Sequence, residues 1–306
     1  MPRLSVVVPV RNQAERLEEL LARLEALQAP AGWEVETVVG YTASEDATAA
    51  VIDAAGVKRI DSQRIGPSAA RNAAAGAANG DLLYFIDADA VPIADDHLVR
   101  LVSAAARFRR FGALGGPVLL APSQRFNPIA QADHLACWFL WGPLRPRGPS
   151  DFQPSVNLVV PRLVFERLGG FDESLRVLED FDFAMKVRGA RLPMFYEPEL
   201  SVYHHARGGL LSSWRHSWYW GAPAREAFYA RVATDRYPHS DNRARFWVNF
   251  PRLLAGRLRV VLKIGWHQSR LVTVLCLPFL LATVTAWAVA VCVGKGQPGS
   301  TEPAPT

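Results

Sequence analysis

The sequence predicts an α/β fold with a mainly parallel central sheet, followed by a basic amphipathic segment and one long apolar helix. Short β-branched runs alternate with helical apolar stripes in the N-terminal half, which is the pattern of βαβ units. The run Leu82–Ile86 is apolar at every position, as expected of a strand covered on both faces. The composition changes in the C-terminal part, where residues 242–301 contain no Asp or Glu.

The predicted elements follow one another in regular order. Asn12 followed by Glu15 predicts a capping box, and leucines from Leu17 to Leu27 then form one face of a helix. Strands are predicted at residues 4–8, 35–39, 57–60, 82–86, 113–120, 156–160 and 200–205, and further helices at 44–55, 67–78, 95–111 and from 179 onward. Residues 121–154 are proline-rich and have no clear assignment, and a loop of that length is usually functional or mobile.

Two carboxylates, Asp87 and Asp89, follow the buried strand, and Pro92 prevents further pairing. Ligands of open α/β sheets bind outside the carboxyl ends of the strands, so these acids lie where a site is expected. Two oxygen ligands one residue apart suit Mg²⁺ or Mn²⁺, ions that usually accompany a diphosphate. The alternative is an acidic turn that closes the strand and binds nothing.

The C-terminal part has the composition of a membrane anchor. Residues 271–294 form 24 positions without a charge, which is about 36 Å of helix against a bilayer core of roughly 30 Å. Seven basic residues precede this stretch and Lys295 alone follows it, which predicts a single pass with the N-terminal part in the cytoplasm. Pro278 predicts a kink in the spanning helix. The alternative is a buried core helix.

Residues 222–270 are predicted to form a basic segment at the membrane interface, which Pro251 divides into two pieces. Residues 295–306 are too short and polar to fold. The basic residues alternate with Trp, Phe and Leu, which favours a membrane and not a nucleic acid as the partner. The three cysteines have no zinc-ligand spacing and form no even set for disulfides, so a reducing compartment suits the chain.

Five motifs in family order resemble the family 2 glycosyltransferases, whose catalytic domain has the GT-A fold. They are Ser5–Asn12, Gly66–Asn72, Asp87–Asp89, Gly169–Asp172 and Glu179–Asp180, within a resemblance that covers roughly residues 4–221. The resemblance implies a catalytic domain over residues 1–221 that transfers a sugar from a nucleotide-diphosphate donor to an acceptor hydroxyl, with inversion. The acceptor is expected to be a lipid or a lipid-linked sugar, because the anchor would hold the site close to the bilayer.

The resemblance also implies a role for each residue of the site. Asp180 resembles the general base, with Glu179 beside it; like charges raise the pKa of Asp180, the helix start lowers it, and the sequence leaves open which effect is larger. Asp89 is the expected ligand of Mn²⁺ or Mg²⁺, together with His204 or the neighbouring His205. The residues expected to bind the donor are Pro9, Arg11, Asn12, Asp61, Arg71 and Asp87.

Two departures from the family pattern limit these implications. Many members carry an Asp after the second strand that reads the nucleobase, whereas this chain has Val38–Tyr41, although Asp61 could help. The Gln-x-x-Arg-Trp pattern of processive synthases is absent as well, which favours a single transfer. Two other functions stay open: a nucleotidyltransferase of related fold, which would release diphosphate, and a membrane-tethered nucleotide-sugar binder without activity.

Overall fold

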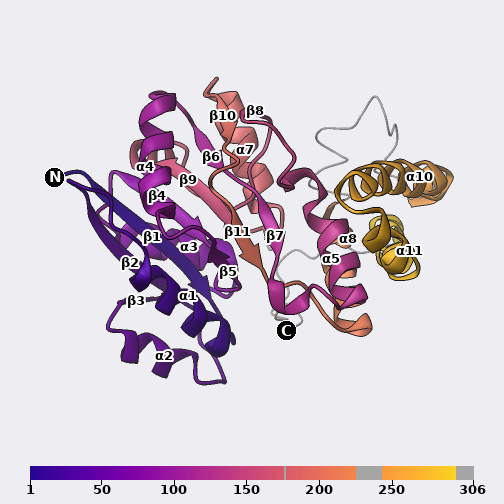
Figure 1. Cartoon of the computed structure of the whole chain (residues 1–306), viewed down its shortest axis with the longest axis horizontal. Helices are drawn as coiled ribbons and strands as arrows, with labels where there is room; N and C mark the ends of the chain where they lie inside the picture. Colours follow the sequence, from indigo (N-terminus) through magenta and orange to yellow (C-terminus); the bar gives the residue numbers. More distant parts are fainter. Residues whose placement is uncertain (176, 225–242, 294–306) are drawn as a thin grey trace. The chain divides into compact units, whose positions relative to one another are not determined.

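The computed structural model describes residues 1–175, 177–224 and 243–293, which form two compact units (Figure 1). Unit 1 comprises Met1–Leu119 and Arg145–His204, and unit 2 comprises Leu120–Leu144 and His205–Thr306. The proline-rich segment therefore belongs largely to unit 2. The domain boundaries predicted at residues 221, 270 and 294 stay predictions, and the predicted polar tail at 295–306 lies outside the described residues.

The core of unit 1 is an eight-stranded sheet with strand order β3-β2-β1-β4-β9-β6-β10-β8. The strand β1 pairs in parallel with β2 and β4, β2 with β3, and β6 with β10, whereas β9 and β8 pair antiparallel to their neighbours. In that order the strands are Lys58–Asp61, Glu34–Tyr41, Arg3–Val10, Leu82–Ile86, Asn157–Pro161, Ala113–Gly115, Met194–Tyr196 and Gly148–Ser150. Every residue of β4 is buried, as its apolar run predicts.

Six helices accompany the sheet in the described part of unit 1. They are α1 (Ala14–Ala26), α2 (Thr48–Ala55), α3 (Pro67–Ala77), α4 (His97–Phe108), α6 (Arg162–Arg167) and α7 (Glu179–Gly189). The buried face of α1 is its leucine stripe. The predicted capping box is wrong: Gln13 precedes α1, and the Asn12 Oδ1 atom accepts a hydrogen bond from the Glu45 N–H at 2.8 Å. Asn12 thus joins the loop after β1 to the loop after β2.

The strand predicted at residues 113–120 is divided in two. Residues Ala113–Gly115 form β6 of the large sheet, whereas β7 (Val118–Leu120) belongs to a three-stranded sheet with β11 (Val202–His204) and β5 (Ala90–Pro92). The break falls at Gly116-Pro117, where the proline has no N–H for the ladder. A Cβ atom at Gly116 would lie 2.2 Å from the Leu200 carbonyl oxygen, so only glycine permits this close approach of the two backbones.

A cluster of phenylalanines packs α7 against the sheet. The ring of Phe85 in β4 contacts that of Phe171 at 5.2 Å between centroids, and Phe171 contacts Phe183 of α7 at 5.3 Å. Burying one such side chain contributes about 1.5–3 kcal/mol. The cluster holds the first turn of α7, with Glu179 and Asp180, beside the carboxyl end of β4.

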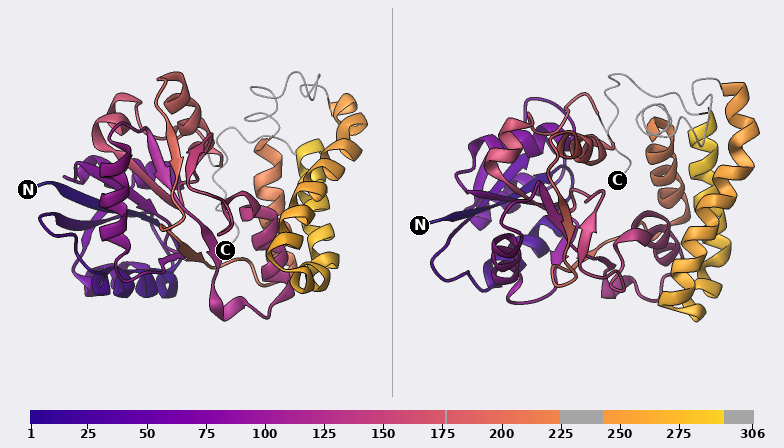
Figure 2. Two further views of the ribbon diagram at one scale, coloured as in Figure 1. Left: turned by 45° about the horizontal axis from the view of Figure 1, so that its top comes forward. Right: turned by 90° about the horizontal axis from the view of Figure 1, so that it is seen from above.

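Unit 2 is helical in its described part. Its long helices are α5 (Pro128–Trp138), α8 (Leu210–Ala224), α10 (Arg243–Gln268) and α11 (Arg270–Val293), with two 3₁₀ turns at Pro122–Gln124 and Phe139–Trp141. The helices α10 and α11 run side by side as a hairpin, and α11 also packs on α5 and α8 (Figure 2). The apolar core of the unit includes Leu135, Val261, Cys276, Leu280 and Val284.

The predicted division at Pro251 is wrong, because α10 continues through this residue. A proline inside a helix removes one hydrogen bond and costs about 3 kcal/mol. Packing offsets that cost: Leu253 is buried, and Leu254, Leu258 and Val261 contact the apolar core of unit 2 in the turns that follow. Tertiary contacts thus override the local preference for a break.

Candidate active site

The carboxyl ends of the parallel strands lie at one edge of the large sheet. Pro9 of β1 is in register with Gly40 of β2, and Tyr41 is in register with Asp61 of β3. The side chain of Asp61 is 66% exposed and pairs with Arg59 at 3.1 Å. The Arg11 Nε atom donates to the Ala43 carbonyl at 3.4 Å. Four of the six expected donor-binding residues, Pro9, Arg11, Asn12 and Asp61, therefore lie at strand ends or in the loops that follow them.

Arg71 occupies the centre of a buried ionic group. Its Nη1 atom donates to Glu179 Oε1 at 2.5 Å and its Nη2 atom donates to Asp87 Oδ1 at 2.6 Å. The Arg71 side chain is 4% exposed, and the two carboxylates raise the pKa of its guanidinium despite the burial. Both of its terminal nitrogens thus bind carboxylates, so the donor contact expected of Arg71 stays a prediction.

Asp180 is the second residue of α7 and is buried beside Glu179. Its Oδ2 atom accepts a hydrogen bond from the Ser155 N–H at 3.3 Å, and its Oδ1 atom accepts one from the Phe181 N–H at 2.7 Å. Burial is the largest cause that raises the pKa of Asp180, to about 7, and the charge of Glu179 adds to it. Arg71 and the two N–H donors oppose this rise without cancelling it. The sequence left open whether the pKa of Asp180 rises or falls, and burial decides that it rises.

Asp89 and His204 form a second group. The residue after Asp89, Ala90, is paired with His204 across β5 and β11, which brings Asp89 Oδ1 within 3.6 Å of His204 Nε2. Both side chains are about one-tenth exposed. A carboxylate oxygen and an imidazole nitrogen that face each other fit a divalent ion that takes its remaining ligands from phosphate and water. Asp87 turns to Arg71, so the two acids of the Asp87–Asp89 motif have different partners.

The structure thus brings the ten expected site residues into three places. Arg71, Asp87, Glu179 and Asp180 form one ionic group, Asp89 and His204 form a pair, and the rest line the sheet edge. Sequence reasoning missed Ser155, whose contribution is a backbone N–H that any residue other than proline could supply. It also missed Asn157, which accepts from the Tyr84 hydroxyl at 3.1 Å and donates to the Leu200 carbonyl at 2.7 Å behind the site.

A different group in unit 2 has the composition of a metal site. Ligand atoms of Asp133, Cys137 and His216 lie within 4.8 Å of one another. Their existing bonds indicate a structural network: Asp133 accepts from the Ser213 hydroxyl at 2.9 Å and from the Arg207 N–H at 3.2 Å. The Trp220 Nε1–H donates to His216 Nε2 at 2.8 Å, which leaves the imidazole proton on Nδ1, facing Asp133.

Comparison with known proteins identifies similar sequences. The family "Glycosyl transferase family 2" matches residues 5–144. The pre-mycofactocin glycosyltransferase of Mycobacterium tuberculosis is 28% identical over 277 residues, which cover 87% of this chain and 54% of that protein. The succinoglycan biosynthesis protein ExoO of Rhizobium meliloti is 27% identical, over 69% of this chain and 63% of that protein. The chain spans about half the length of the first of these relatives.

Two solved structures share the fold. The mannosyltransferase PcManGT from Pyrobaculum calidifontis, in complex with GDP-Man and Mn²⁺, has a TM-score of 0.61 at 21% identity and covers 95% of this chain and 86% of its own. TarS 1–349 of S. aureus, in complex with UDP, has a TM-score of 0.52 at 14% identity and covers 95% and 90%. The chain has the GT-A fold, and residues 5–144 of it resemble glycosyl transferase family 2.

Proposed function

We propose that the protein transfers a sugar from a nucleotide diphosphate to an acceptor hydroxyl, with inversion at the anomeric carbon. The observation that carries this proposal is Asp180, buried beside Glu179 and Arg71 at the carboxyl end of β4, with a pKa raised to about 7. A carboxylate with such a pKa is suited to accept a proton near neutral pH.

In the proposed reaction Asp180 takes the proton of the acceptor hydroxyl while that oxygen bonds to the anomeric carbon. The bond from this carbon to the diphosphate oxygen breaks, and the nucleoside diphosphate leaves with the electron pair. The N–H groups of Ser155 and Phe181 hold the carboxylate in place. Glu179, fixed by Arg71, disfavours ionisation of Asp180 and so increases its affinity for the proton.

Asp89 and His204 are the residues that we propose to hold Mn²⁺ or Mg²⁺. Their donor atoms face each other at 3.6 Å. A divalent ion bound there would neutralise the charge that develops on the departing diphosphate. The structures that resemble this chain contain GDP-Man with Mn²⁺ in one case and UDP in the other, which supports a nucleotide-sugar donor. The proposed contacts to that donor are Pro9 and Asp61 at strand ends and Arg11 and Asn12 in the loop after β1.

Membrane attachment through the C-terminal helices is part of the proposal. Among the described residues, α11 is the one helix long and apolar enough to cross a membrane, with a mean hydropathy of 2.3 in its best window. Its length permits the single pass that the sequence predicts, with the catalytic part in the cytoplasm. Attachment to a bilayer makes a lipid or lipid-linked acceptor the first class to test.

The test is a turnover assay of the full chain with GDP- and UDP-sugars, in Mn²⁺, in Mg²⁺ and in a chelator. We expect metal-dependent release of the nucleoside diphosphate, increased by lipid acceptors. Release of free diphosphate would instead indicate a nucleotidyltransferase. Donor binding without turnover under any of these conditions would indicate a binding protein and would overturn the proposal.

A further inference from the structure

The exposed face of α10 is basic and has no acidic neighbour along either helix of the hairpin. Arg252, Arg259, Lys263 and His267 recur at helical spacing on this face, and Arg270 follows at the start of α11. Leu253 and Val261 lie on the opposite, buried face. Neither α10 nor α11 contains an Asp or Glu. The outer surface of α10 therefore suits an anionic partner.

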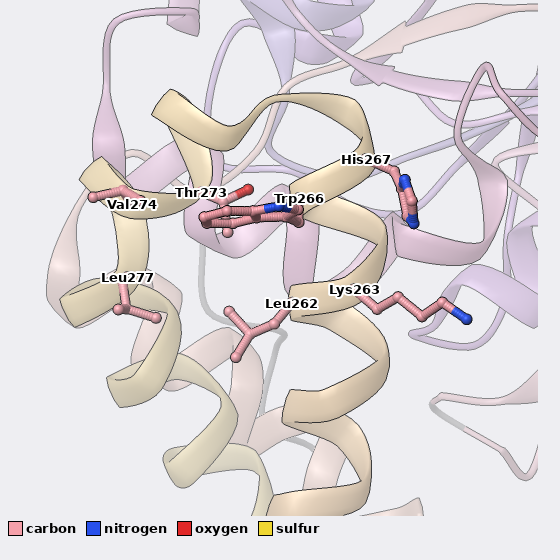
Figure 3. Close-up of a pocket in the computed structure, with 7 residues that line it drawn as sticks. All are labelled: Leu262, Lys263, Trp266, His267, Thr273, Val274 and Leu277. Carbon is pink, nitrogen blue, oxygen red and sulfur yellow. The ribbon is translucent and has the colours of Figure 1, made fainter.

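The same surface continues onto the first half of α11 as an apolar stripe. Leu271, Val274 and Leu275 are 69%, 54% and 62% exposed, next to Trp266 at 48%. A groove of about 400 Å³ joins the two helices and is lined by residues from both (Figure 3). In Figure 3, Leu262 and Trp266 lie between the helices, whereas Lys263 and His267 project from α10 away from α11. Basic and apolar groups thus border one open groove.

The second half of α11 has a different environment. Thr283, Val284, Ala288, Val291 and Cys292 are all buried within unit 2. The helices that surround α11 carry buried polar groups: the Ser213 hydroxyl of α8 lies 3.3 Å from the Thr283 hydroxyl, and the same Ser213 donates to Asp133 of α5. Gly221 of α8 packs closely on α11, because a Cβ atom there would lie 2.6 Å from the Trp287 carbonyl oxygen.

These contacts bear on how α11 can meet a bilayer. If α11 crossed the hydrocarbon core alone, it would have to leave this packing and expose Ser213 and Asp133. If it crossed with its neighbours, the Asp133–His216 network and the basic face of α10 would enter the hydrocarbon, at a high cost in free energy. Neither cost arises if the helices stay together at the surface of one leaflet.

We propose that unit 2 is a monotopic anchor for an anionic membrane: α11 stays packed on α5, α8 and α10, and the α10–α11 hairpin lies in one leaflet. The basic face of α10 meets the lipid phosphates. Trp266, Leu271, Val274 and Leu275 enter the acyl boundary, and the groove between the helices takes an acyl chain. This proposal does not depend on sugar transfer and differs from the single pass predicted from the sequence.

The first experiment determines the topology of the full chain in cells. An epitope tag is placed before Met1 in one form and after Thr306 in another, and protease is added to spheroplasts and to inverted vesicles, with a lumenal protein as the control for sealing. A monotopic anchor leaves both tags on the same side of the membrane. Tags on opposite sides would overturn the proposal, and so would recovery of the full chain in the soluble fraction.

The second experiment tests the lipid surface itself. Vesicles of phosphatidylcholine with phosphatidylglycerol are compared with pure phosphatidylcholine, using the full chain and its Arg259→Gln/Lys263→Gln variant. Each basic residue near an anionic leaflet contributes about 1 kcal/mol, so the variant should bind about 30-fold more weakly. The control variant, Arg16→Gln/Arg188→Gln, removes the same amount of charge from unit 1. It should bind the anionic vesicles as tightly as the unchanged protein does.

Equal losses in the two double variants would show that net charge alone drives binding, and would overturn the assignment to α10. A Trp266→Ala/Leu275→Ala variant that keeps full affinity for the vesicles at high salt would overturn the proposal that these apolar side chains enter the acyl boundary. Donor turnover with a water-soluble acceptor should be unchanged in all these variants, since none of the substituted residues belongs to the proposed active site. A loss of turnover would therefore not be confused with a failure of membrane binding.

Discussion

Arg71 Nη1 and Glu179 Oε1 lie 2.5 Å apart and join α3 to the first turn of α7 across 108 residues of sequence. This bond positions Asp180, the next residue, as well as Glu179. Three carboxylates, those of Asp87, Glu179 and Asp180, share one buried cation. Because burial disfavours the charged form of Asp180 and the charge of Glu179 adds to this effect, Asp180 keeps its proton up to a pH of about 7.

Replacement of Asp180 by Asn should abolish transfer and leave donor binding nearly intact. The amide can still accept the Phe181 N–H, but it cannot take the proton of the acceptor. We expect the rate to fall by about 10²–10⁴-fold, with a small change in donor affinity. In the unchanged protein kcat/KM should increase with pH as Asp180 ionises, and level off above about pH 7. The measurements are turnover and donor titration across this pH range.

The matched control is Asp182→Asn, which removes a charge from the same helical turn. Asp182 pairs with Lys186 at 3.2 Å and does not belong to the Arg71 group. Its rate should stay within a few-fold of the unchanged protein. A collapse of donor affinity in Asp180→Asn would show that this residue supports the donor site and is not a base.

The same pKa predicts an unusual dependence of stability on pH. The folded protein holds the Asp180 proton up to a pH of about 7, whereas an unfolded chain releases it near the ordinary value of 3.8. The contribution of Asp180 to stability is therefore fully present below about pH 3.8 and is lost as the pH rises through 7. Asp180→Asn should gain stability relative to the unchanged protein over this interval, by about 1–3 kcal/mol at pH 8.

Urea midpoints of both proteins at pH 5 and pH 8 measure this effect. Several other carboxyls, such as Glu36 and Asp46, have lowered pKa values and change stability in the opposite direction. The difference between the two proteins removes those contributions, since both contain them. A difference that is equal at the two pH values would contradict the raised pKa of Asp180.

Local patterns in the sequence predicted the central strand, the position of Asp87 and Asp89 after it, and the start of α7 at Glu179. Each of these rests on residues that are neighbours in the chain. The strand at 113–120 was predicted wrongly although Pro117 is visible in the sequence, whereas the close approach of Gly116 to the Leu200 carbonyl joins residues far apart in the chain and could not be predicted. The prediction that Pro251 divides the segment was wrong for the same kind of reason. The apolar contacts that keep α10 intact come from α5 and α11, which are distant in the sequence.

The ionic partners in the site were beyond sequence reasoning for the same reason. Arg71 has the position of a phosphate ligand near a helix N-terminus, and its two carboxylate partners come from other elements, 16 and 108 residues away. Whether the pKa of Asp180 rises or falls depends on burial, which a list of neighbouring charges does not reveal. The Asp133–His216 contact likewise joins residues 83 positions apart.

Replacement of Arg71 by Met should destabilise the protein and move its pH dependence. The substitution leaves Glu179 and Asp87 without their buried cation, a change that typically costs about 3–5 kcal/mol. Arg71 also lowers the pKa of Asp180, so its removal should shift the pH–rate profile of any remaining activity to higher pH. Urea unfolding and a pH–rate profile measure the two effects. A stability loss with no shift in the profile would mean that Arg71 does not act on Asp180.

Replacement of Asp89 by Asn should keep the fold and remove the effect of metal on donor binding. In the unchanged protein, donor at about 100 times its dissociation constant in Mn²⁺ should add about 2.7 kcal/mol of stability, visible as a higher Tm. Asp89→Asn should show no such increase, whereas Asp95→Asn, at an exposed position paired with Arg23, should respond fully. An unchanged Mn²⁺-dependent increase in Asp89→Asn would show that this residue is not a ligand.

Replacement of Gly116 by Ala tests the turn that separates β6 from β7. The added Cβ would lie 2.2 Å from the Leu200 carbonyl oxygen and 2.7 Å from that of Glu197, and neither backbone oxygen can move as a flexible side chain would. We expect the free energy of unfolding, measured in urea, to fall by about 2–4 kcal/mol, as for other substitutions that overpack a tight site.

Gly189→Ala is the matched control, because a Cβ at this position in α7 meets nothing within 4 Å and should be neutral or slightly stabilising. Leu200 shortly precedes β11, which carries His204, so the displaced backbone should also weaken Mn²⁺-dependent donor binding. Equal stability of the two alanine variants would show that the backbones at Gly116 and Leu200 are not in close contact.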